Sequence, residues 1–257
     1  MALLSFGVTI IIVGSIYLTI IIPAYNEQTR LPLTLKNIDY YLRKQDYSSE
    51  VIVVSDGSTD ETRRVAEEFE WSTSRCRVFE YFPNKGKGAA VKFGMLEARG
   101  DIRLFMDADL SVPVVFIETC LIEINKGNGV VIGSRALNKS LVIQGQSFFR
   151  QTLGKMYGIL LNTFTGLGIK DTQCGFKMFT SETTERLFPV LFCVNQLFDA
   201  EILLLARSYN ISIVEVPVDW YHDGDTRLSY SFLKSIWVLK ELLKLRQRAK
   251  VLAEQNE

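Results

Sequence analysis

The chain has 257 residues, of which 47% are hydrophobic, so it is long enough to bury a full core in one large α/β domain. Its 29 Lys and Arg residues balance its 29 Asp and Glu residues, and the overall field of such a chain does not attract nucleic acid. The four cysteines are far apart and form no Cys-x-x-Cys pair, which argues against a zinc site and a disulfide framework and favours reduced thiols.

Residues 1–16 form a hydrophobic N-terminal segment and are a candidate membrane anchor. No residue from Leu3 to Ile22 is charged, and this length is near the minimum for a membrane-spanning helix. However, residues 17–22 are rich in branched side chains and also fit a buried β-strand, which leaves about fifteen apolar residues for a span. The first basic residue is Arg30, so the basic start of a signal peptide is missing. A membrane-inserted or interfacial segment and a fully buried start both remain open.

Apolar strands then alternate with amphipathic helices. Strands are predicted at 17–22, 51–54, 77–82, from 102 into Asp107, and at 130–133. Helices are predicted at 31–42, after the second strand as far as Phe69, and from the Asn84–Ala90 loop as far as Ala98. Continuous apolar strands separated by helices indicate an α/β fold with a mostly parallel, Rossmann-like sheet that is covered on both faces.

Charged side chains follow several of these strands. Asp56 follows the second strand, Asp107 and Asp109 follow the fourth, and Arg135 follows the fifth. Ligands of open α/β sheets bind at the carboxyl ends of the strands, so these residues are expected at one edge. Asp107 and Asp109 share one face if the strand stays extended and fan around a common centre if it turns, and either arrangement could hold a divalent ion. The same spacing recurs at Asp223-Gly224-Asp225, so the pair alone is weak support.

The chemistry must depend mainly on carboxylates, because the chain has a single histidine, His222. Carboxylates favour Mg²⁺ or Mn²⁺ over zinc. The chain also offers no set of Ser, Cys and His residues for covalent hydrolysis. A carboxylate pair, a neighbouring Asp and several arginines suit a nucleotide diphosphate bridged by a metal ion. Glycines at Asn84–Ala90 precede a helix and suit an anion, although neither G-x-G-x-x-G nor a P-loop is present.

The pattern changes after Arg135. Residues 148–164 form a wide apolar surface that includes Arg150, typical either of an amphipathic helix on a membrane or hydrophobic partner or of an ordinary core helix. Residues 171–177 are predicted as a polar turn that leads into a short strand. The remaining elements are predicted as a helix at 198–206, a strand at 211–216, a surface helix at 232–245 and a solvated tail at 246–257.

Ordered motifs along residues 17–245 resemble glycosyltransferase family 2 with its GT-A fold. The motifs lie at 21–27, 53–60, 84–88, 106–109, 133–135, 150, 171–177 and 198–201. They are most similar to the polyprenyl-phosphate branch, and the string Asp171–Lys177 is similar to that of dolichyl-phosphate β-glucosyltransferases. The resemblance implies a nucleotide-sugar half at 17–135 and an acceptor half at 136–245, with amphipathic membrane-facing helices toward the C-terminus. Ser55 departs from the pattern, because many members carry a second acid there.

The same resemblance implies roles for individual residues. Donor contacts are implied for Pro23, Ala24, Tyr25, Glu27, Asp56, Lys87, Asp107, Ala108, Asp109 and Arg227, with Asp56 reading the base. Asp107 and Asp109 are implied as metal ligands, and Arg135 and Arg150 as ligands of the acceptor phosphate. The implied catalytic residues are Asp107, Asp109, Arg135, Arg150 and Asp199. Asp199 and Glu201 are the base candidates if the acceptor is a sugar hydroxyl.

The activity implied is inverting transfer of glucose from UDP-glucose to dolichyl or another polyprenyl phosphate, with Mg²⁺ or Mn²⁺ as cofactor. The protein is then expected to be membrane-associated with its active site facing the cytosol, at the endoplasmic reticulum if eukaryotic. A lipid phosphate is already anionic near neutral pH, so positioning arginines matter more than a general base. The alternatives are a GDP-mannose-dependent dolichyl-phosphate mannosyltransferase, a polysaccharide or glycan transferase, and a non-catalytic nucleotide-sugar-binding membrane protein.

Overall fold

The computed structural model describes residues 15–137, 142–143, 166–195, 197–221, 241–248, 250–251 and 254. The main strands are β1 (Leu18–Ala24), β2 (Ser49–Asp56), β3 (Arg75–Tyr81), β4 (Ile102–Met106), β5 (Val130–Ser134), β7 (Phe176–Thr180) and β8 (Ile213–Pro217). The helices are α1 (Leu31–Leu42), α2 (Thr62–Glu67), α3 (Lys87–Glu97), α4 (Phe116–Asn125), α6 (Ser181–Leu187) and α7 (Phe198–Ser208). Two short strands, β6 (Val142–Ile143) and β9 (Trp220–Tyr221), pair with each other.

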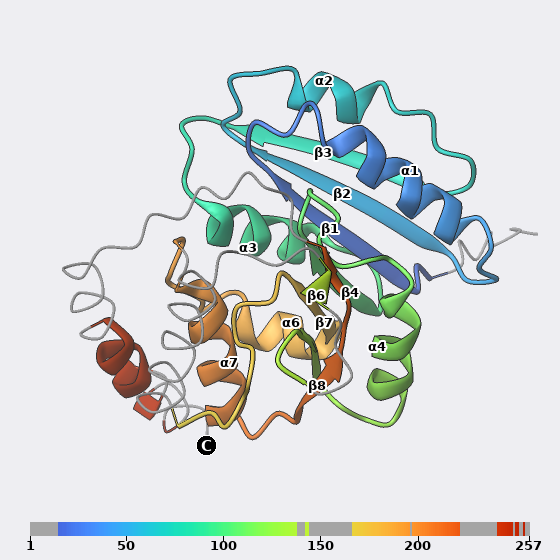
Figure 1. Cartoon of the computed structure of the whole chain (residues 1–257). Coiled ribbons are helices and arrows are strands. Elements are labelled where there is room, and N and C mark those ends of the chain that lie inside the picture. Colours follow the sequence, from blue (N-terminus) through green and yellow to red (C-terminus); the bar gives the residue numbers. More distant parts are fainter. Residues whose placement is uncertain are drawn as a thin grey trace, which may run out of the picture.

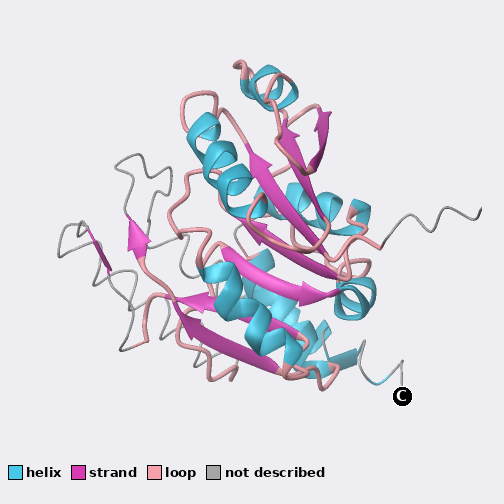
Figure 2. Cartoon of the chain, turned by 90° about the vertical axis from the view of Figure 1, so that its right-hand side faces the viewer, coloured by secondary structure: helices cyan, strands magenta, loops and turns pink. Residues whose placement is uncertain are grey.

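The main strands form one seven-stranded sheet in the order β3-β2-β1-β4-β7-β5-β8, with helices on both faces (Figures 1 and 2). All neighbours are parallel except β7, which runs antiparallel to both β4 and β5. The mostly parallel sheet is therefore confirmed. The strand order reverses at β1, with β2 on one side and β4 on the other, and ligands of α/β folds bind at such a switch point.

Alternate side chains of the central strands enter two separate apolar layers. Ile21 and Phe105 pack with α3, α6 and α7, whereas Ile20 and Leu104 pack with α1, α2 and α4 on the other face. Both faces of the sheet are therefore covered, which explains why these strands are continuously apolar in the sequence.

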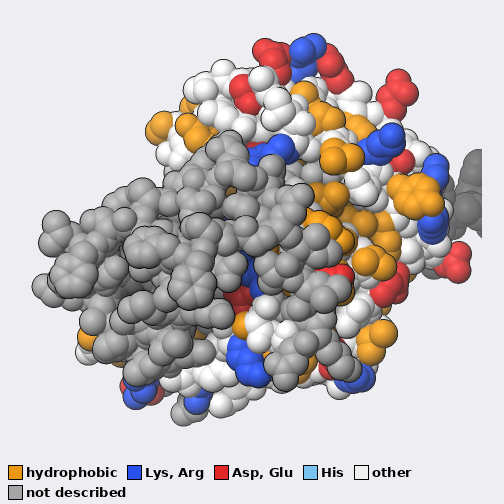
Figure 3. Space-filling view, in the orientation of Figure 1, with side chains coloured by type: hydrophobic (Ala, Val, Ile, Leu, Met, Phe, Trp, Pro, Cys, Tyr) orange, Lys and Arg blue, Asp and Glu red, His pale blue; other side chains and the backbone are white. Residues whose placement is uncertain are grey.

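On the face drawn in Figure 3, basic and acidic side chains lie interspersed along the rim.

All four cysteines are free, as predicted. Burial raises the pKa values of the Cys174 and Cys193 thiols to about 12. Thiolates are the reactive form of cysteine, so these two thiols are protonated and unreactive near neutral pH.

The structure adds four elements to the predicted ones and differs from the prediction at the tail. The helices α4 and α6 and the short strands β6 and β9 were not predicted. The tail predicted as solvated, 246–257, begins inside a helical stretch, residues 241–248, and Arg248 donates hydrogen bonds to Glu201 at 2.6 Å and to the Val190 carbonyl at 2.9 Å. This part of the tail packs against the domain because Glu201 is buried and requires a cationic partner.

Several predictions lie outside the described residues. They concern residues 1–14 of the N-terminal segment, the amphipathic stretch 148–164, most of the helix 232–245, and the site residues Arg150 and Arg227. Among the residues that are described, no helix combines the length and the apolar character needed to cross a membrane.

Candidate active site

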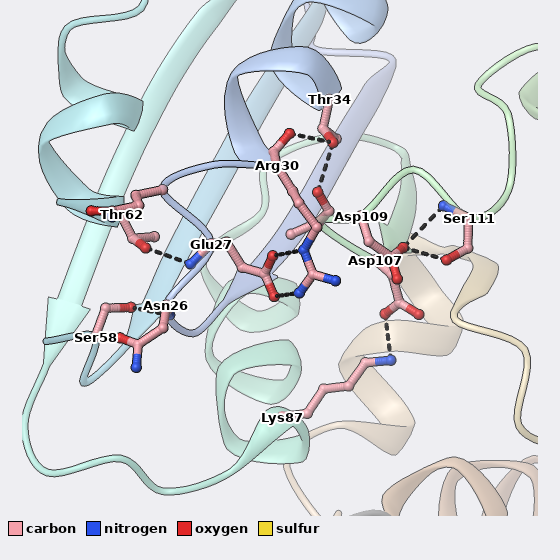
Figure 4. A network of polar contacts seen from close by, with 12 residues as sticks. Asn26, Glu27, Arg30, Thr34, Ser58, Thr62, Lys87, Asp107, Asp109 and Ser111 are labelled. Carbon is pink, nitrogen blue, oxygen red and sulfur yellow. Dashed lines mark hydrogen bonds and ion pairs between the residues drawn. The ribbon is translucent and has the colours of Figure 1, made fainter. Parts of the chain in front are cut away.

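Asp107 and Asp109 lie in a turn directly after β4, so the alternative in which the chain turns is the one observed. The backbone N–H of Ser111 donates to the Asp109 carboxylate at 2.9 Å, and the Ser111 hydroxyl donates to it as well (Figure 4). From α1, the Thr34 hydroxyl donates to the Ala108 carbonyl at 2.6 Å. The turn is therefore held on both sides, and the two carboxylates project from a rigid strand end.

The Asp107 carboxylate is enclosed by α3 and by the residue before β7. Lys87, in the first turn of α3, forms an ion pair with Asp107 (Figure 4). Burial opposes the charge of Lys87, but the attraction of Asp107, Asp199 and Asp109 together outweighs it and raises the pKa of Lys87. The Asp107 N–H donates to the Gly175 carbonyl at 3.1 Å, and a Cβ at Gly175 would lie 2.0 Å from Asp107 Oδ2. Glycine is therefore required at 175 for the carboxylate to occupy its place.

A second ion pair is buried beneath this turn. Lys177 of β7 is fully buried, and its ammonium donates to the carboxylate of Asp199, in the first turn of α7, and to the Cys174 carbonyl at 2.7 Å. Burial raises the pKa of Asp199, although the attraction of Lys177 and Lys87 opposes this shift. The structure thus places Asp199 in a buried pair with only 4% of the residue exposed, and its role as a base stays a prediction.

Arg135, just beyond β5, is fixed by Asp171. Its guanidinium donates to both carboxylate oxygens, at 2.7 and 2.9 Å, and its backbone N–H donates at 2.9 Å. Burial opposes the charge of Arg135, but Asp171 outweighs it and raises the pKa of Arg135, while the pair lowers the pKa of Asp171 against the effect of burial. Trp220 of β9 lies below the guanidinium, with 5.4 Å from its ring centroid to Cζ. A bidentate pair of this kind orients the arginine plane.

The predicted donor residues lie at the carboxyl ends of β1 and β2. Pro23 and Ala24 end β1, and Tyr25 follows with 37% exposure. The Glu27 carboxylate accepts two hydrogen bonds from the Arg30 guanidinium, both at 2.6 Å, and the Glu27 N–H donates to Thr62 at 2.7 Å (Figure 4). The loop after β1 is therefore tied to both α1 and α2.

Asp56 ends β2 and holds the loop before α3. Its two carboxylate oxygens accept hydrogen bonds from the backbone N–H groups of Lys85 at 2.8 Å and Gly86 at 2.9 Å. The Gly88 N–H donates to the Val194 carbonyl at 2.9 Å, and a Cβ at Gly86 would lie 2.5 Å from that same oxygen. The N–H groups of Lys85, Gly86 and Gly88 therefore do not form the anion site that these glycines suggested, because protein oxygens already accept hydrogen bonds from them. The glycines serve the close approach of two loops.

One pocket connects Asp107 with Arg135. It is lined by Met106, Asp107, Ser111, Val112, Arg135, Gln173, Gly175, Phe176 and Trp220. The structure thus brings together Asp107, one of the two predicted metal ligands, and Arg135, one of the two predicted ligands of the acceptor phosphate. The pairing of Asp171 with Arg135 and the placement of Gln173 and Trp220 were missed. The motif 171–177 carried a signal for Asp171 and Gln173, but its contacts depend on how β7 pairs with β5. The sequence carried no signal for Trp220.

The chemistry of the acid pair fits a hard divalent ion. Among the described residues, no group of three or more His, Cys, Asp or Glu side chains could hold a metal by itself. Mg²⁺ and similar ions in phosphate-handling sites are usually bound by one or two carboxylates together with substrate phosphates. Asp107 and Asp109 supply that number of carboxylates, so the site fits an ion whose coordination the donor diphosphate completes.

Solved structures in complex with UDP match the fold of this chain. The glucosyl-3-phosphoglycerate synthase of Mycobacterium tuberculosis, in complex with Mn²⁺, UDP and glucosyl-3-phosphoglycerate, matches with a TM-score of 0.65 at 17% identity, over 92% of this chain and 80% of that one. The same enzyme with Mg²⁺ and UDP matches with a TM-score of 0.62, over 92% of this chain and 79% of that one, also at 17% identity. At this level of identity the match establishes the fold, which confirms the GT-A prediction.

Sequence comparison identifies the family. The dolichyl-phosphate beta-glucosyltransferase of Dictyostelium discoideum is 38% identical over 248 residues, covering 92% of this chain and 76% of that protein. Those of Saccharomyces cerevisiae and Homo sapiens are 36% and 34% identical, each over 90% of this chain and over 74% and 75% of the relative. The model of glycosyl transferase family 2 matches residues 19–188. The chain therefore belongs to glycosyltransferase family 2.

Proposed function

We propose that this protein transfers glucose from UDP-glucose to dolichyl phosphate with inversion at the anomeric carbon. The observation that carries the proposal is the pocket that joins Asp107, on the metal and diphosphate side, with Arg135, held by Asp171 on the acceptor side. The names of the relatives, dolichyl-phosphate beta-glucosyltransferases at 34% to 38% identity, support this acceptor and this sugar. The Mn²⁺ and UDP in the complex of the structural neighbour support the donor nucleotide and the metal.

In this proposal UDP lies at the carboxyl ends of β1 and β2. Pro23, Ala24, Tyr25 and Glu27 line its place on the first strand end, and Asp56 is the proposed reader of the uracil ring. The Asp56 carboxylate is buried and already oriented by two backbone N–H groups, so it presents a fixed edge at the rim of the sheet.

Mg²⁺ or Mn²⁺, held by Asp107 and Asp109 when bound, would neutralise the diphosphate leaving group. Lys87 adds a second positive charge at the same place, because its ammonium lies against Asp107 and its pKa is raised. A protonated lysine there stabilises the negative charge that develops on the departing UDP. Arg227 is the proposed third cation at the pyrophosphate.

The acceptor phosphate is proposed to bind Arg135 and Arg150. A phosphate oxygen forms the new bond to C1 of glucose, the bond from C1 to the β-phosphate oxygen breaks, and UDP leaves with the bonding electrons. No proton has to be removed from an anionic phosphate, so this reaction needs no general base. Asp199 is buried in its pair with Lys177, which agrees with a reaction that needs no general base. Asp171 keeps the Arg135 guanidinium in one orientation, which favours in-line attack.

A lipid acceptor requires the active site to work at a membrane. We propose a membrane-associated enzyme whose active site faces the cytosol, at the endoplasmic reticulum in a eukaryote, with residues 1–16 as the anchor. The support is the lipid acceptor in the names of the relatives together with the uncharged N-terminal sequence.

A donor panel tests the proposal. UDP-glucose, UDP-galactose, UDP-N-acetylglucosamine and GDP-mannose are each supplied with a short polyprenyl phosphate and Mn²⁺, and the lipid-linked product is quantified. We expect UDP-glucose to be preferred and Asp109→Ala to abolish transfer. Asp101→Ala, which removes an exposed carboxylate at the opposite end of β4, should retain transfer. Preference for GDP-mannose would favour the mannosyltransferase alternative, and UDP binding without turnover would favour the non-catalytic one.

A further inference from the structure

Gln173 brings an unsatisfied amide into the pocket between Asp107 and Arg135. Its side chain lines the pocket, and its Nε2 is buried without a hydrogen-bond partner among the described residues. The Gln173 backbone N–H donates to Asp171 at 3.3 Å, so the carboxylate that fixes Arg135 also fixes this residue. A buried donor without a partner lowers stability, and a native protein that keeps one in a pocket commonly uses it for a ligand.

The other polar side chains of the pocket wall already have partners in the described structure. Asp107 pairs with Lys87, Arg135 pairs with Asp171, and the Ser111 hydroxyl donates to the Asp109 carboxylate. Met106, Val112 and Phe176 are apolar. Gln173 therefore differs from these neighbours in having a hydrogen-bond donor that no group of the described residues accepts.

The position of the pocket identifies the part of the substrate that faces Gln173. If the proposed function holds, Asp107 marks the departing diphosphate and Arg135 marks the attacking phosphate. The anomeric carbon of the sugar is bonded to the departing diphosphate and approached by the attacking phosphate. The sugar ring therefore lies between these two groups, in the space that Gln173 lines.

We propose that the Gln173 carboxamide binds hydroxyl groups of the transferred hexose and so contributes to the choice of sugar. This inference rests on the proposed function. An amide carries two N–H donors and one carbonyl acceptor, and a sugar hydroxyl both donates and accepts, so one carboxamide can bind two neighbouring hydroxyls. Inverting one hydroxyl in an epimer breaks one of these bonds and leaves the amide unpaired again, which disfavours the epimer.

The test separates sugar binding from nucleotide binding. Dissociation constants of UDP and UDP-glucose are measured by calorimetry with Mn²⁺ for the wild type, Gln173→Leu and Gln173→Glu. The ratio of the constant for UDP to the constant for UDP-glucose reports how much the glucosyl group adds to the affinity. We expect Gln173→Leu to lower this ratio about tenfold with the affinity for UDP unchanged, the effect of one lost hydrogen bond. Gln173→Glu keeps an acceptor but loses the donor, so its ratio should fall in between.

Deoxyglucose donors sharpen the test. A deoxy donor that lacks a hydroxyl bound by Gln173 should lose less affinity in Gln173→Leu than UDP-glucose does, whereas a deoxy donor that keeps the bound hydroxyls should show the full loss, as in a double-mutant cycle. Thr172→Val is the matched control, because Thr172 also carries a buried hydroxyl without a partner among the described residues but does not line the pocket. Its ratio should equal that of the wild type.

The outcomes distinguish this inference from the function on which it rests. Unchanged ratios in both Gln173 variants, in an enzyme whose wild type transfers glucose, would overturn the inference and leave the function intact. An equal loss of UDP and UDP-glucose affinity would also overturn it, because the residue would then support the fold and not the sugar. A wild type that binds UDP but transfers no glucose to a polyprenyl phosphate would overturn the proposed function as well.

Discussion

Replacing Gly175 by alanine tests whether the activity depends on the position of the Asp107 carboxylate. An added Cβ would lie 2.0 Å from Oδ2, 2.4 Å from Cγ and 2.6 Å from Oδ1 of Asp107, whereas real Cβ contacts stay beyond 3.0 Å. Because all three carboxyl atoms are too close, rotating the carboxyl group in place does not relieve the contact. The backbones are held together by the hydrogen bond from the Asp107 N–H to the Gly175 carbonyl, so the side chain itself must move by about 1 Å.

A displacement of this size from a productive geometry lowers the rate about a hundredfold. We expect kcat/KM of Gly175→Ala to fall by that order and its half-saturating Mn²⁺ concentration to rise, while overpacking lowers the free energy of unfolding by about 1–3 kcal/mol. The assay measures glucose transfer across a Mn²⁺ titration, together with urea unfolding.

Gly127→Ala is the control for lost stability without a clash. Gly127 has a φ of +95°, and no atom lies within 4 Å of the place that a Cβ would occupy, so alanine there strains the backbone by about 1–2 kcal/mol away from the site. It should keep wild-type kcat/KM. If Gly175→Ala matched the wild type in both kcat/KM and Mn²⁺ dependence, the Asp107 carboxylate would not be required where it lies.

The charged pairs give three further predictions. Lys87→Met removes the cation that competes with Mn²⁺ for Asp107, so in the absence of donor Mn²⁺ should bind severalfold more tightly, while kcat/KM falls. Electron paramagnetic resonance measures the Mn²⁺ binding, and weaker binding would contradict this prediction. Lys177→Met leaves Asp199 buried without its ion-pair partner and should lower the free energy of unfolding, measured in urea, by about 3–5 kcal/mol. Adding Asp199→Leu should recover much of this loss, whereas additive losses would argue against the pair. The pKa of Asp171 is lower in the folded than in the unfolded protein, so its carboxylate stabilises the fold fully above the unfolded pKa of about 4, and this stabilisation is lost as the pH falls through the lower folded pKa. Asp171→Asn should therefore flatten the fall of Tm at acid pH. An unchanged fall would refute this prediction.

Local patterns in the sequence predicted the elements that bear the site. The helix expected at 31–42 begins and ends where α1 does, and the apolar runs at 51–54 and 130–133 lie within β2 and β5. Periodicity sufficed there because each element buries its own stripe of side chains against the sheet. The sequence also allowed Asp107 and Asp109 to lie in a turn, but choosing that alternative required the contacts of Thr34 and Ser111, which come from other segments.

Contacts between distant segments could not be predicted. Arg135 and Asp171 are 36 residues apart, and they meet because β5 pairs with β7. The glycine at 175 resembles an ordinary turn residue until the Asp107 side chain is placed against it. Asp199 fits the N-terminus of a helix in the sequence, and only the fold shows the buried Lys177 beside it.

The insertion of β7 between β4 and β5 has a consequence for biosynthesis. β1 to β4 can pair with one another once residue 106 has left the ribosome, but β5 has only β7 and β8 as neighbours in the sheet. The segment Val130–Ser134 must therefore wait until Phe176–Thr180 has been made before it gains a partner, and the edge of β4 stays open for the same interval. An exposed apolar edge is prone to mispairing with other chains, so this interval is when the nascent protein most needs protection by chaperones.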